Sequence, residues 1–261
     1  MSKGTQELRE QYLALLDKNE KEQVYQKFIE DHTQLVPREF VQNHGVACQI
    51  VLRKLPFGAD YKSDFFFLSK SSDDWNAVFV EIEKPSSLFF REGTNEFHRD
   101  FVHALQQIGQ WRAWLDDNQA ALLNMVNTMR VPETMRRNKT YDKFVLVYGR
   151  RAEYHANDIR RGLIRAQERP DFKIMTFDSL AEDLEHKDEL MLGIRRNEYI
   201  DLINEVCDDI AFRWLEPTEI RVTEAHREKI RGVTPAFANK NTGFADRVLI
   251  RNESEKIELA E

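Results

Sequence analysis

The chain has 261 residues, of which 41% are hydrophobic and 32% are charged, and its formal net charge is −7. This composition is typical of a globular protein with a real core. It contains no run of about 18 apolar residues that would span a membrane. The negative total argues against a nucleic-acid coat protein, but not against an enzyme that binds nucleic acid through a local basic patch.

The N-terminus and the cysteines indicate the compartment. The polar start, MSKGTQELREQYLALL, lacks the short apolar stretch of a signal peptide, so we expect a cytoplasmic protein. Cys48 and Cys207 lie far apart and form no CxxC pair, so we expect two buried, reduced thiols. His98 and His103 are five residues apart and do not share a helix face, so a zinc pair is not expected.

The first half of the chain predicts a helix, three strands and a long helix. Residues 6–31 have helical character, and Pro37 follows them. Strands are expected at 46–55, 64–70 and 77–85, separated by turns at 56–60 and 71–75. An apolar stripe at helical spacing predicts a helix over 95–117, with Asn95 as its cap.

The second half predicts alternating helices and strands. Helices are expected at 118–130, 155–168 and 178–190, strands at 144–150 and 172–177, and an amphipathic helix at 195–216 before a polar, irregular tail. Neighbouring early strands can pair as an antiparallel meander, whereas the later strand–helix–strand unit must be parallel. We therefore expect a mixed α/β sheet flanked by helices over residues 1–190, and a C-terminal helical appendage over 191–261.

Acidic residues gather at the ends of two predicted strands. Asp64 opens one strand, while Glu81 and Glu83 lie two apart on the next and so share a face. If these strands pair as a hairpin, the three carboxylates crowd one end of the sheet, and their repulsion favours binding of a hard cation such as Mg²⁺. The alternative is that this face of the strand is simply solvated.

A set of segments carries a resemblance to a known family. They are EQVYQKFIEDH at 22–32, SDFFFL at 63–68, VEIEKPSSLFF at 80–90, EFHRDFVHALQQIGQWRAWL at 96–115, KFVLVYGRR at 143–151 and KIMTFDSL at 173–180. In order and spacing they resemble the Shedu family of bacterial anti-phage nucleases, which has the PD-(D/E)xK nuclease fold. The resemblance spans roughly residues 15–186.

The resemblance implies a Mg²⁺- or Mn²⁺-dependent DNA endonuclease that assembles into homo-oligomers, with no membrane partner. Asp64 and Glu81 would be its metal-binding carboxylates, and Glu22 an acid that faces the site from the first helix. Gln107 with Trp111 resembles a Gln-x-x-x-Tyr element that orients nucleic acid or the metal site. Alternatively, Gln107 is only a polar position beside the stripe and Trp111 belongs to the core.

One position departs from the motif, which expects Glu-x-Lys with a lysine that positions or activates the attacking water. Here Glu83 occupies the lysine position, and Lys84 follows one residue late. Glu83 can replace the lysine as base and metal ligand, which we prefer. A bulge before Pro85 can instead turn Lys84 into the site. A third alternative is a nuclease-fold module that binds or senses nucleic acid without cleaving it, and a fourth is a protein-interaction scaffold.

Basic residues cluster around the second strand–helix unit. Arginine is well suited to phosphate, because its planar guanidinium can donate two hydrogen bonds. The candidate nucleic-acid contacts are Arg136, Arg137, Lys139, Arg150, Arg151, Arg160 and Arg161. The alternative is a solvated helix face whose arginines pair with Glu153, Asp158 and Glu168.

Overall fold

The computed structural model describes residues 3–58, 61–208, 210–233, 243–251 and 257–259. The N-terminal part forms two helices, α1 (Lys3–Leu16) and α2 (Glu22–Asp31), where a single helical region was expected. Three strands follow, β1 (Ile50–Phe57), β2 (Tyr61–Lys70) and β3 (Asp74–Ile82). The predicted turn between β1 and β2 contains Gly58 at a φ of +66°, while Asp60 lies outside the described residues.

The long helix is α3 (Arg99–Met125), which continues through most of the segment expected to form a second helix. Its cap is His98, whose side chain accepts a hydrogen bond from the backbone N–H of Asp100, so the predicted Asn95 cap is wrong. The chain then forms β4 (Lys139–Val147), α4 (Asp158–Arg165), β5 (Phe172–Met175) and the short helix α5 (Phe177–Leu180).

The strand pairing confirms the expected meander. β1 pairs antiparallel with β2, and β2 pairs antiparallel with β3. β3, β4 and β5 are parallel neighbours, joined through α3 and α4. The described strands therefore form a mixed α/β sheet flanked by helices.

The C-terminal part extends this sheet, so the predicted helix at 195–216 and the helical appendage are wrong. The chain continues as β6 (Met191–Arg195), β7 (Ile200–Leu202), β8 (Ile220–Val222), α6 (Glu224–Val233), β9 (Leu249–Arg251) and β10 (Ile257–Leu259). β6 pairs parallel with β1, so the sheet crosses the expected domain boundary at residue 190. Within the described residues its order is β10-β9-β8-β7-β6-β1-β2-β3-β4-β5.

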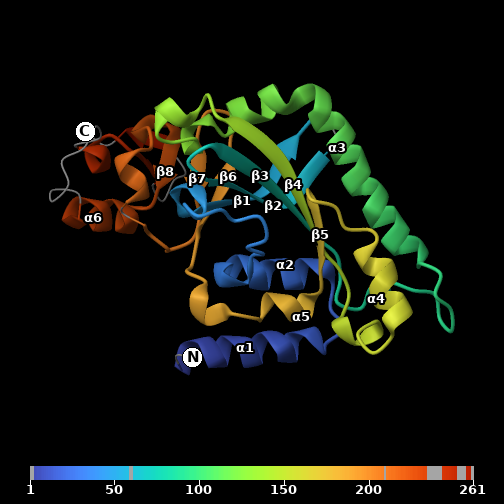
Figure 1. Cartoon of the computed structure of the whole chain (residues 1–261). Coiled ribbons are helices and arrows are strands. Elements are labelled where there is room, and N and C mark those ends of the chain that lie inside the picture. Colours follow the sequence, from blue (N-terminus) through green and yellow to red (C-terminus); the bar gives the residue numbers. More distant parts are fainter. Residues whose placement is uncertain (1–2, 59–60, 209, 234–242, 252–256, 260–261) are drawn as a thin grey trace.

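Helices cover both faces of the sheet. Figure 1 shows α1, α2 and α5 together on one side and α3 on the other. On the α3 side, Ile108 and Trp111 pack with Phe66 and Phe79 of the strands. On the opposite side, Tyr12, Tyr25 and Ile29 pack with Phe65 and Val80. Successive residues of β2 and β3 thus alternate between two apolar cores, which fixes the register of the meander.

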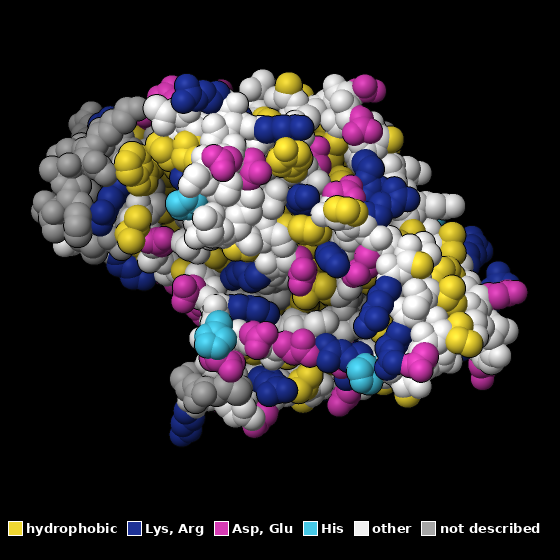
Figure 2. Space-filling view, in the orientation of Figure 1, with side chains coloured by type: hydrophobic (Ala, Val, Ile, Leu, Met, Phe, Trp, Pro, Cys, Tyr) yellow, Lys and Arg dark blue, Asp and Glu magenta, His cyan; other side chains and the backbone are white. Residues whose placement is uncertain are grey.

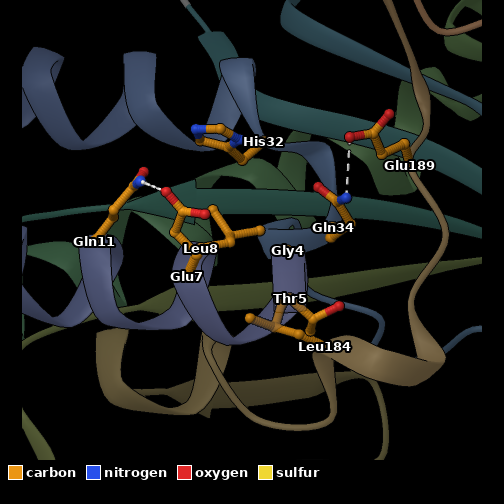
Figure 3. A pocket seen from close by; sticks show the side chains of 9 residues that line it. All are labelled: Gly4, Thr5, Glu7, Leu8, Gln11, His32, Gln34, Leu184 and Glu189. Carbon is orange, nitrogen blue, oxygen red and sulfur yellow. Dashed lines mark hydrogen bonds between the residues drawn. The ribbon is translucent and has the colours of Figure 1, made fainter. Parts of the chain in front are cut away.

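A hollow of about 420 Å³ lies among α1, the end of α2 and the segment 184–189. Gln11 Nε2 donates to Glu7 Oε1 over 3.2 Å, and Gln34 Nε2 donates to Glu189 Oε1 over 3.0 Å. Figure 3 shows both pairs at the hollow. This hollow shares no lining residue with the predicted site. Among the helices that the structure describes, none is both long and apolar enough to cross a membrane.

Candidate active site

Asp64 and Glu81 meet across the β2–β3 hairpin. Phe65 pairs with Val80, which sets Asp64 level with Glu81 one step further along the two strands. Asp64 is buried, and its Oδ2 accepts a hydrogen bond from the backbone N–H of Ile82 over 2.8 Å. The register therefore brings together the two carboxylates that the sequence placed at one end of the sheet.

The Glu81 carboxylate is only half satisfied. Its Oε1 accepts a hydrogen bond from Gln107 Nε2 on α3 over 2.6 Å, whereas its buried Oε2 has no hydrogen-bond partner among the described residues. Burial raises the pKa of Glu81 well above its ordinary value, and the charge of Asp64 raises it further. A buried oxygen without a donor is unfavourable, and a bound cation would relieve it.

Glu83 and Glu22 surround this pair at longer range. Glu83 follows the end of β3, where its backbone N–H donates to Val147 O over 3.0 Å. Burial, together with the charges of Glu22 and Asp64, raises the pKa of Glu83 to about 7. Glu22 opens α2, and burial followed by the charge of Asp64 raises its pKa as well. The charge of Asp64 therefore raises the pKa of both Glu83 and Glu22, although the described acids do not gather into the single cluster that the sequence predicts.

Lys54 of β1 is the cation that contacts Asp64, and the sequence analysis missed it. It lies level with Asp64, between the pairs Arg53–Phe65 and Leu55–Ser63, and its Nζ forms an ion pair with Asp64 Oδ1. Its φ is +46°, a left-handed conformation that is strained in any residue with a side chain. Lys84 lies exposed beyond β3, and its charge lowers the pKa of Glu22 and of Glu83.

The donor set suits a hard cation, although it is not a gathered cluster. Within the described residues, no three His, Cys, Asp or Glu side chains are grouped as a metal site. Mg²⁺, however, commonly takes one or two protein carboxylates and keeps several waters. The unsatisfied Oε2 of Glu81 offers an oxygen of this kind, while both oxygens of Asp64 also contact the chain, through Lys54 Nζ and the Ile82 N–H.

Gln107 and Trp111 differ in what they contact. Gln107 donates to Glu81, so it contacts one of the candidate site residues. Trp111 is buried in the core, packing edge-on against Phe57 with ring centroids 5.2 Å apart. The alternative interpretation, that these two residues have only a structural role, therefore fits Trp111 but not Gln107.

Most arginines of the candidate nucleic-acid surface bind other parts of the chain. Arg150 pairs with Asp178 at 2.9 Å and Asp17 at 3.1 Å, Arg151 with Glu182 at 2.5 Å, and Arg161 with Asp158. Figure 2 shows Lys and Arg interspersed with Asp and Glu on the visible face, rather than gathered into one basic patch.

The remaining positions of that surface differ among themselves. Arg136 donates from its Nε to Arg130 O over 3.2 Å, and Arg160 donates from Nη1 to Glu153 O over 3.2 Å and lies over the Phe90 ring. Arg137 and Lys139 are exposed. A nucleic-acid contact stays a prediction for all seven residues, and it requires least rearrangement at Arg137 and Lys139.

Cys48 and Cys207 are both half-buried rather than fully buried. Burial raises the pKa of Cys48 to about 12, so its thiol is held in the neutral form. Neither cysteine is one of the three neighbouring site residues Lys54, Asp64 and Glu81.

Comparison with known proteins identifies one family. The family model described as Shedu protein SduA, C-terminal, matches residues 19–181, which is more than half of the chain. No curated protein matches the chain. The matched segment includes Glu22, Lys54, Asp64, Glu81 and Gln107, and it ends before β6.

Proposed function

Because the chain belongs to the Shedu family of anti-phage defence proteins, through its SduA C-terminal segment, we propose that it is a metal-dependent DNA endonuclease. The PD-(D/E)xK fold is part of the same proposal. The antiparallel β1–β3 meander, the crossover helix α3 and the parallel strand β4 support it. The observation that carries the proposal is the buried, unsatisfied Oε2 of Glu81 beside Asp64.

Asp64 and Glu81 would hold Mg²⁺ or Mn²⁺, with Glu83 and Glu22 nearby. When bound, such an ion activates water and neutralises the charge that develops on the scissile phosphate. Gln107 fixes the orientation of the Glu81 carboxylate through its hydrogen bond to Oε1. Lys54 holds Asp64 in place through their ion pair and adds positive charge where the phosphate approaches.

The Glu83 carboxylate is suited to accept the proton of the attacking water. A general base works best when its pKa lies near the working pH, and that of Glu83 is raised to about 7. This supports Glu83, rather than the exposed Lys84, in the place of the motif lysine. The homo-oligomer implied by the family is likewise part of the proposal.

A plasmid-nicking assay with Mg²⁺ and with Mn²⁺ tests the proposal. Asp64→Ala and Glu81→Gln should each lower the cleavage rate by about 10³-fold, equivalent to roughly 4 kcal/mol in the barrier. Asp73→Asn is the matched control, because Asp73 is an exposed acid in the turn between β2 and β3. Its cleavage rate should stay within twofold of wild type.

Two outcomes would contradict the proposal. Cleavage that survives both Asp64→Ala and Glu81→Gln would end the site assignment. A wild-type protein that retains DNA but cleaves with neither ion would instead be the binding or sensing module. Calorimetry with Mn²⁺ separates these cases, since only the nuclease site requires an ion that Glu81→Gln releases.

A further inference from the structure

Two adjoining hollows lie among the end of β2, the segment 127–136 and residues 210–219. The larger has a volume of about 560 Å³ and the smaller about 250 Å³. Val131, Pro132 and Trp214 line both, so the hollows share a wall, and together we call them the Trp214 groove. None of the described lining residues belongs to the candidate active site. Asp64 lies near the start of β2, whereas Lys70 at the other end of this strand lines the groove.

Trp214 and Ile210 expose apolar surface in the smaller hollow. Trp214 is 45% exposed and Ile210 is 57% exposed, and both line this hollow. Among the described residues the Trp214 indole N–H has no hydrogen-bond partner, whereas that of the buried Trp75 donates to Met135 O over 2.9 Å. Single exposed apolar side chains are ordinary. Two that line one hollow, with an indole N–H left to donate, are typical of a surface that binds a partner.

Carboxylates give the larger hollow a negative charge. Glu133, Glu216 and Glu219 are exposed at its lining, and Arg136 is the cation among the described lining residues. Arg136 lies 3.7 Å from Glu133, while neither Glu216 nor Glu219 forms an ion pair with a described residue. Burial lowers the pKa of Arg195, and the charge of Glu219 partly offsets this. A cation held here would be attracted both by the carboxylates and by the face of the neighbouring indole ring.

Thr128 is a second, independent observation in the larger hollow. It lines this hollow and is only 7% exposed, and its buried Oγ1 has no hydrogen-bond partner among the described residues. A buried hydroxyl without a partner is unfavourable, and most such groups in folded proteins are satisfied. A ligand with backbone N–H and C=O groups, or a water held beneath it, would supply the missing hydrogen bond.

We propose that the Trp214 groove binds an extended peptide segment of a partner protein, with a basic side chain next to a large apolar one. The lysine or arginine of this segment lies against Trp214, Glu216 and Glu219 in the larger hollow, and the apolar side chain fills the smaller hollow beside Ile210. The larger hollow is within the range of about 300–1,000 Å³ that ligand sites occupy. A nucleic acid is disfavoured, because the carboxylates repel phosphates.

This inference goes beyond nuclease activity and does not depend on it. The family-matched segment ends at residue 181, whereas Ile210, Trp214, Glu216 and Glu219 follow it. The groove therefore exists only where the matched segment and the C-terminal part of the chain meet. A partner bound there would contact both parts at a place separate from the candidate active site.

Fluorescence anisotropy on the full chain tests the groove with three short, fluorescein-labelled peptides. One alternates leucine with lysine and arginine, the second alternates leucine with glutamine, and the third alternates leucine with glutamate. The basic peptide should bind with a Kd on the order of 10–100 µM. The neutral peptide should bind about tenfold more weakly, and the acidic peptide should show no binding.

Two variants of the groove should lose this affinity. Trp214→Ala and the double substitution Glu216→Gln with Glu219→Gln should each weaken binding of the basic peptide about tenfold in Kd. Because these side chains are exposed, the melting temperature should stay within about 2 °C of wild type. Plasmid cleavage should be unchanged in both variants.

Matched controls separate the groove from the net charge of the protein. Ile159→Ala replaces another exposed apolar residue, which lies on α4. Glu10→Gln with Glu92→Gln removes the same two negative charges at exposed positions outside the groove. Both controls should bind the basic peptide within twofold of wild type.

Several results would overturn the groove. One is equal affinity for the three peptides, or the absence of binding at about 1 mM. Another is an equal loss of affinity in the charge-matched control, which would mean that only net charge attracts the peptide. Free arginine amide that binds as tightly as the basic peptide would indicate a small-cation site instead. If no peptide binds and Trp214→Ala lowers the sedimentation coefficient, a second copy of the chain occupies the groove.

The groove and the nuclease proposal fail separately. Asp64→Ala should bind the basic peptide as wild type does while losing plasmid cleavage. A protein that cuts the plasmid but binds the peptide no better than Trp214→Ala would therefore lose the groove and keep the nuclease site.

Discussion

Two acids in one sheet have opposite environments. Glu81 has one oxygen held by Gln107 and another, buried, without a partner among the described residues, and burial raises its pKa. Asp201 of β7 is fully buried, yet Arg221 and Arg251 donate to it and Arg196 lies 3.9 Å away. Burial alone would raise the pKa of Asp201, but Arg221 and Arg251 outweigh it and lower the pKa.

The comparison separates a structural acid from a functional one. Arginines of the same chain compensate the charge of Asp201, so its carboxylate needs no ligand from outside the folded protein. Glu81 has two negative neighbours, Asp64 and Glu83, whose charges raise its pKa, while the Gln107 hydrogen bond and the charge of Lys54 lower it. Groups with such displaced pKa values are typical of sites that bind something from outside.

The largest expected effect on stability lies at the structural acid. Asp201→Asn leaves Arg221 and Arg251 without their buried anion, which should lower the free energy of unfolding by about 3–5 kcal/mol. Urea denaturation measures this change. Glu81→Gln, which replaces a poorly solvated carboxylate, should cause no loss. Equal destabilisation by the two substitutions would erase the distinction between the acids.

The second prediction concerns the lysines. Lys54→Ala should lower the rate of DNA cleavage about 100-fold, or 2.7 kcal/mol, because Asp64 loses its ion-pair partner. Lys84→Ala should remain within threefold of wild type, because Lys84 lies exposed beyond β3. Single-turnover kinetics measure both rates. If Lys84→Ala cleaves DNA more slowly than Lys54→Ala, then Lys84 has the role of the motif lysine.

The third prediction concerns added cations. Ca²⁺ at about 100 times its Kd should raise the free energy of unfolding by about 2.7 kcal/mol if it binds only the folded protein. Glu81→Gln should abolish this gain, while Asp201→Asn should keep it despite its lower starting stability. Thermal unfolding with Ca²⁺ and with EDTA gives the difference, and a gain that survives in Glu81→Gln would place the cation elsewhere.

The smallest expected effect is the pH dependence of Glu83. Its pKa is 4.5 in the unfolded chain and about 7 in the fold, so between these values the folded protein binds the extra proton. The free energy of unfolding therefore falls as pH rises from 4.5 to about 7. Because Glu83 is partly exposed and screened, the loss should be on the order of 1 kcal/mol.

Glu83→Gln isolates this effect. The variant should match wild type at low pH and be more stable above neutrality, as denaturation across the pH range would show. A constant difference between the two proteins at every pH would mean that Glu83 titrates normally.

The sequence predicts the N-terminal two-thirds of the sheet better than the rest. β2 and β3 are ten and nine residues long and carry the consecutive apolar runs Phe65–Leu68 and Ala77–Val80, and α3 has an apolar stripe over most of its length. Such long patterns average out local exceptions, so the meander and the Asp64–Glu81 pair follow from them.

The C-terminal strands lack patterns of that length. β7 has three residues, and Leu202, Ile203 and Val206 happen to recur at helical spacing. Their true partners are distant, since Leu202 pairs with Gly193. Periodicity within a segment cannot detect pairing of this kind, and it led to the wrong helix at 195–216.

Lys54 was missed for a related reason. Leu52 and Leu55 both face the core on the α3 side, three residues apart instead of two, because the left-handed backbone at Lys54 interrupts the alternation. The alternation of side chains between the two faces of β1 therefore breaks at Lys54, the residue that contacts Asp64. The local strain and the functional position coincide, as they often do.

Because β6 pairs with β1, the family-matched segment, residues 19–181, depends on the C-terminal part of the chain for its stability. Without residues 191–261, the edge of β1 at Ile50, Val51 and Leu52 would lose its neighbour and present bare amides and carbonyls beside buried aliphatic side chains. Such an edge invites other strands to add to it. The family-matched segment is therefore not a portable module, and a truncated version should precipitate rather than act as a minimal nuclease.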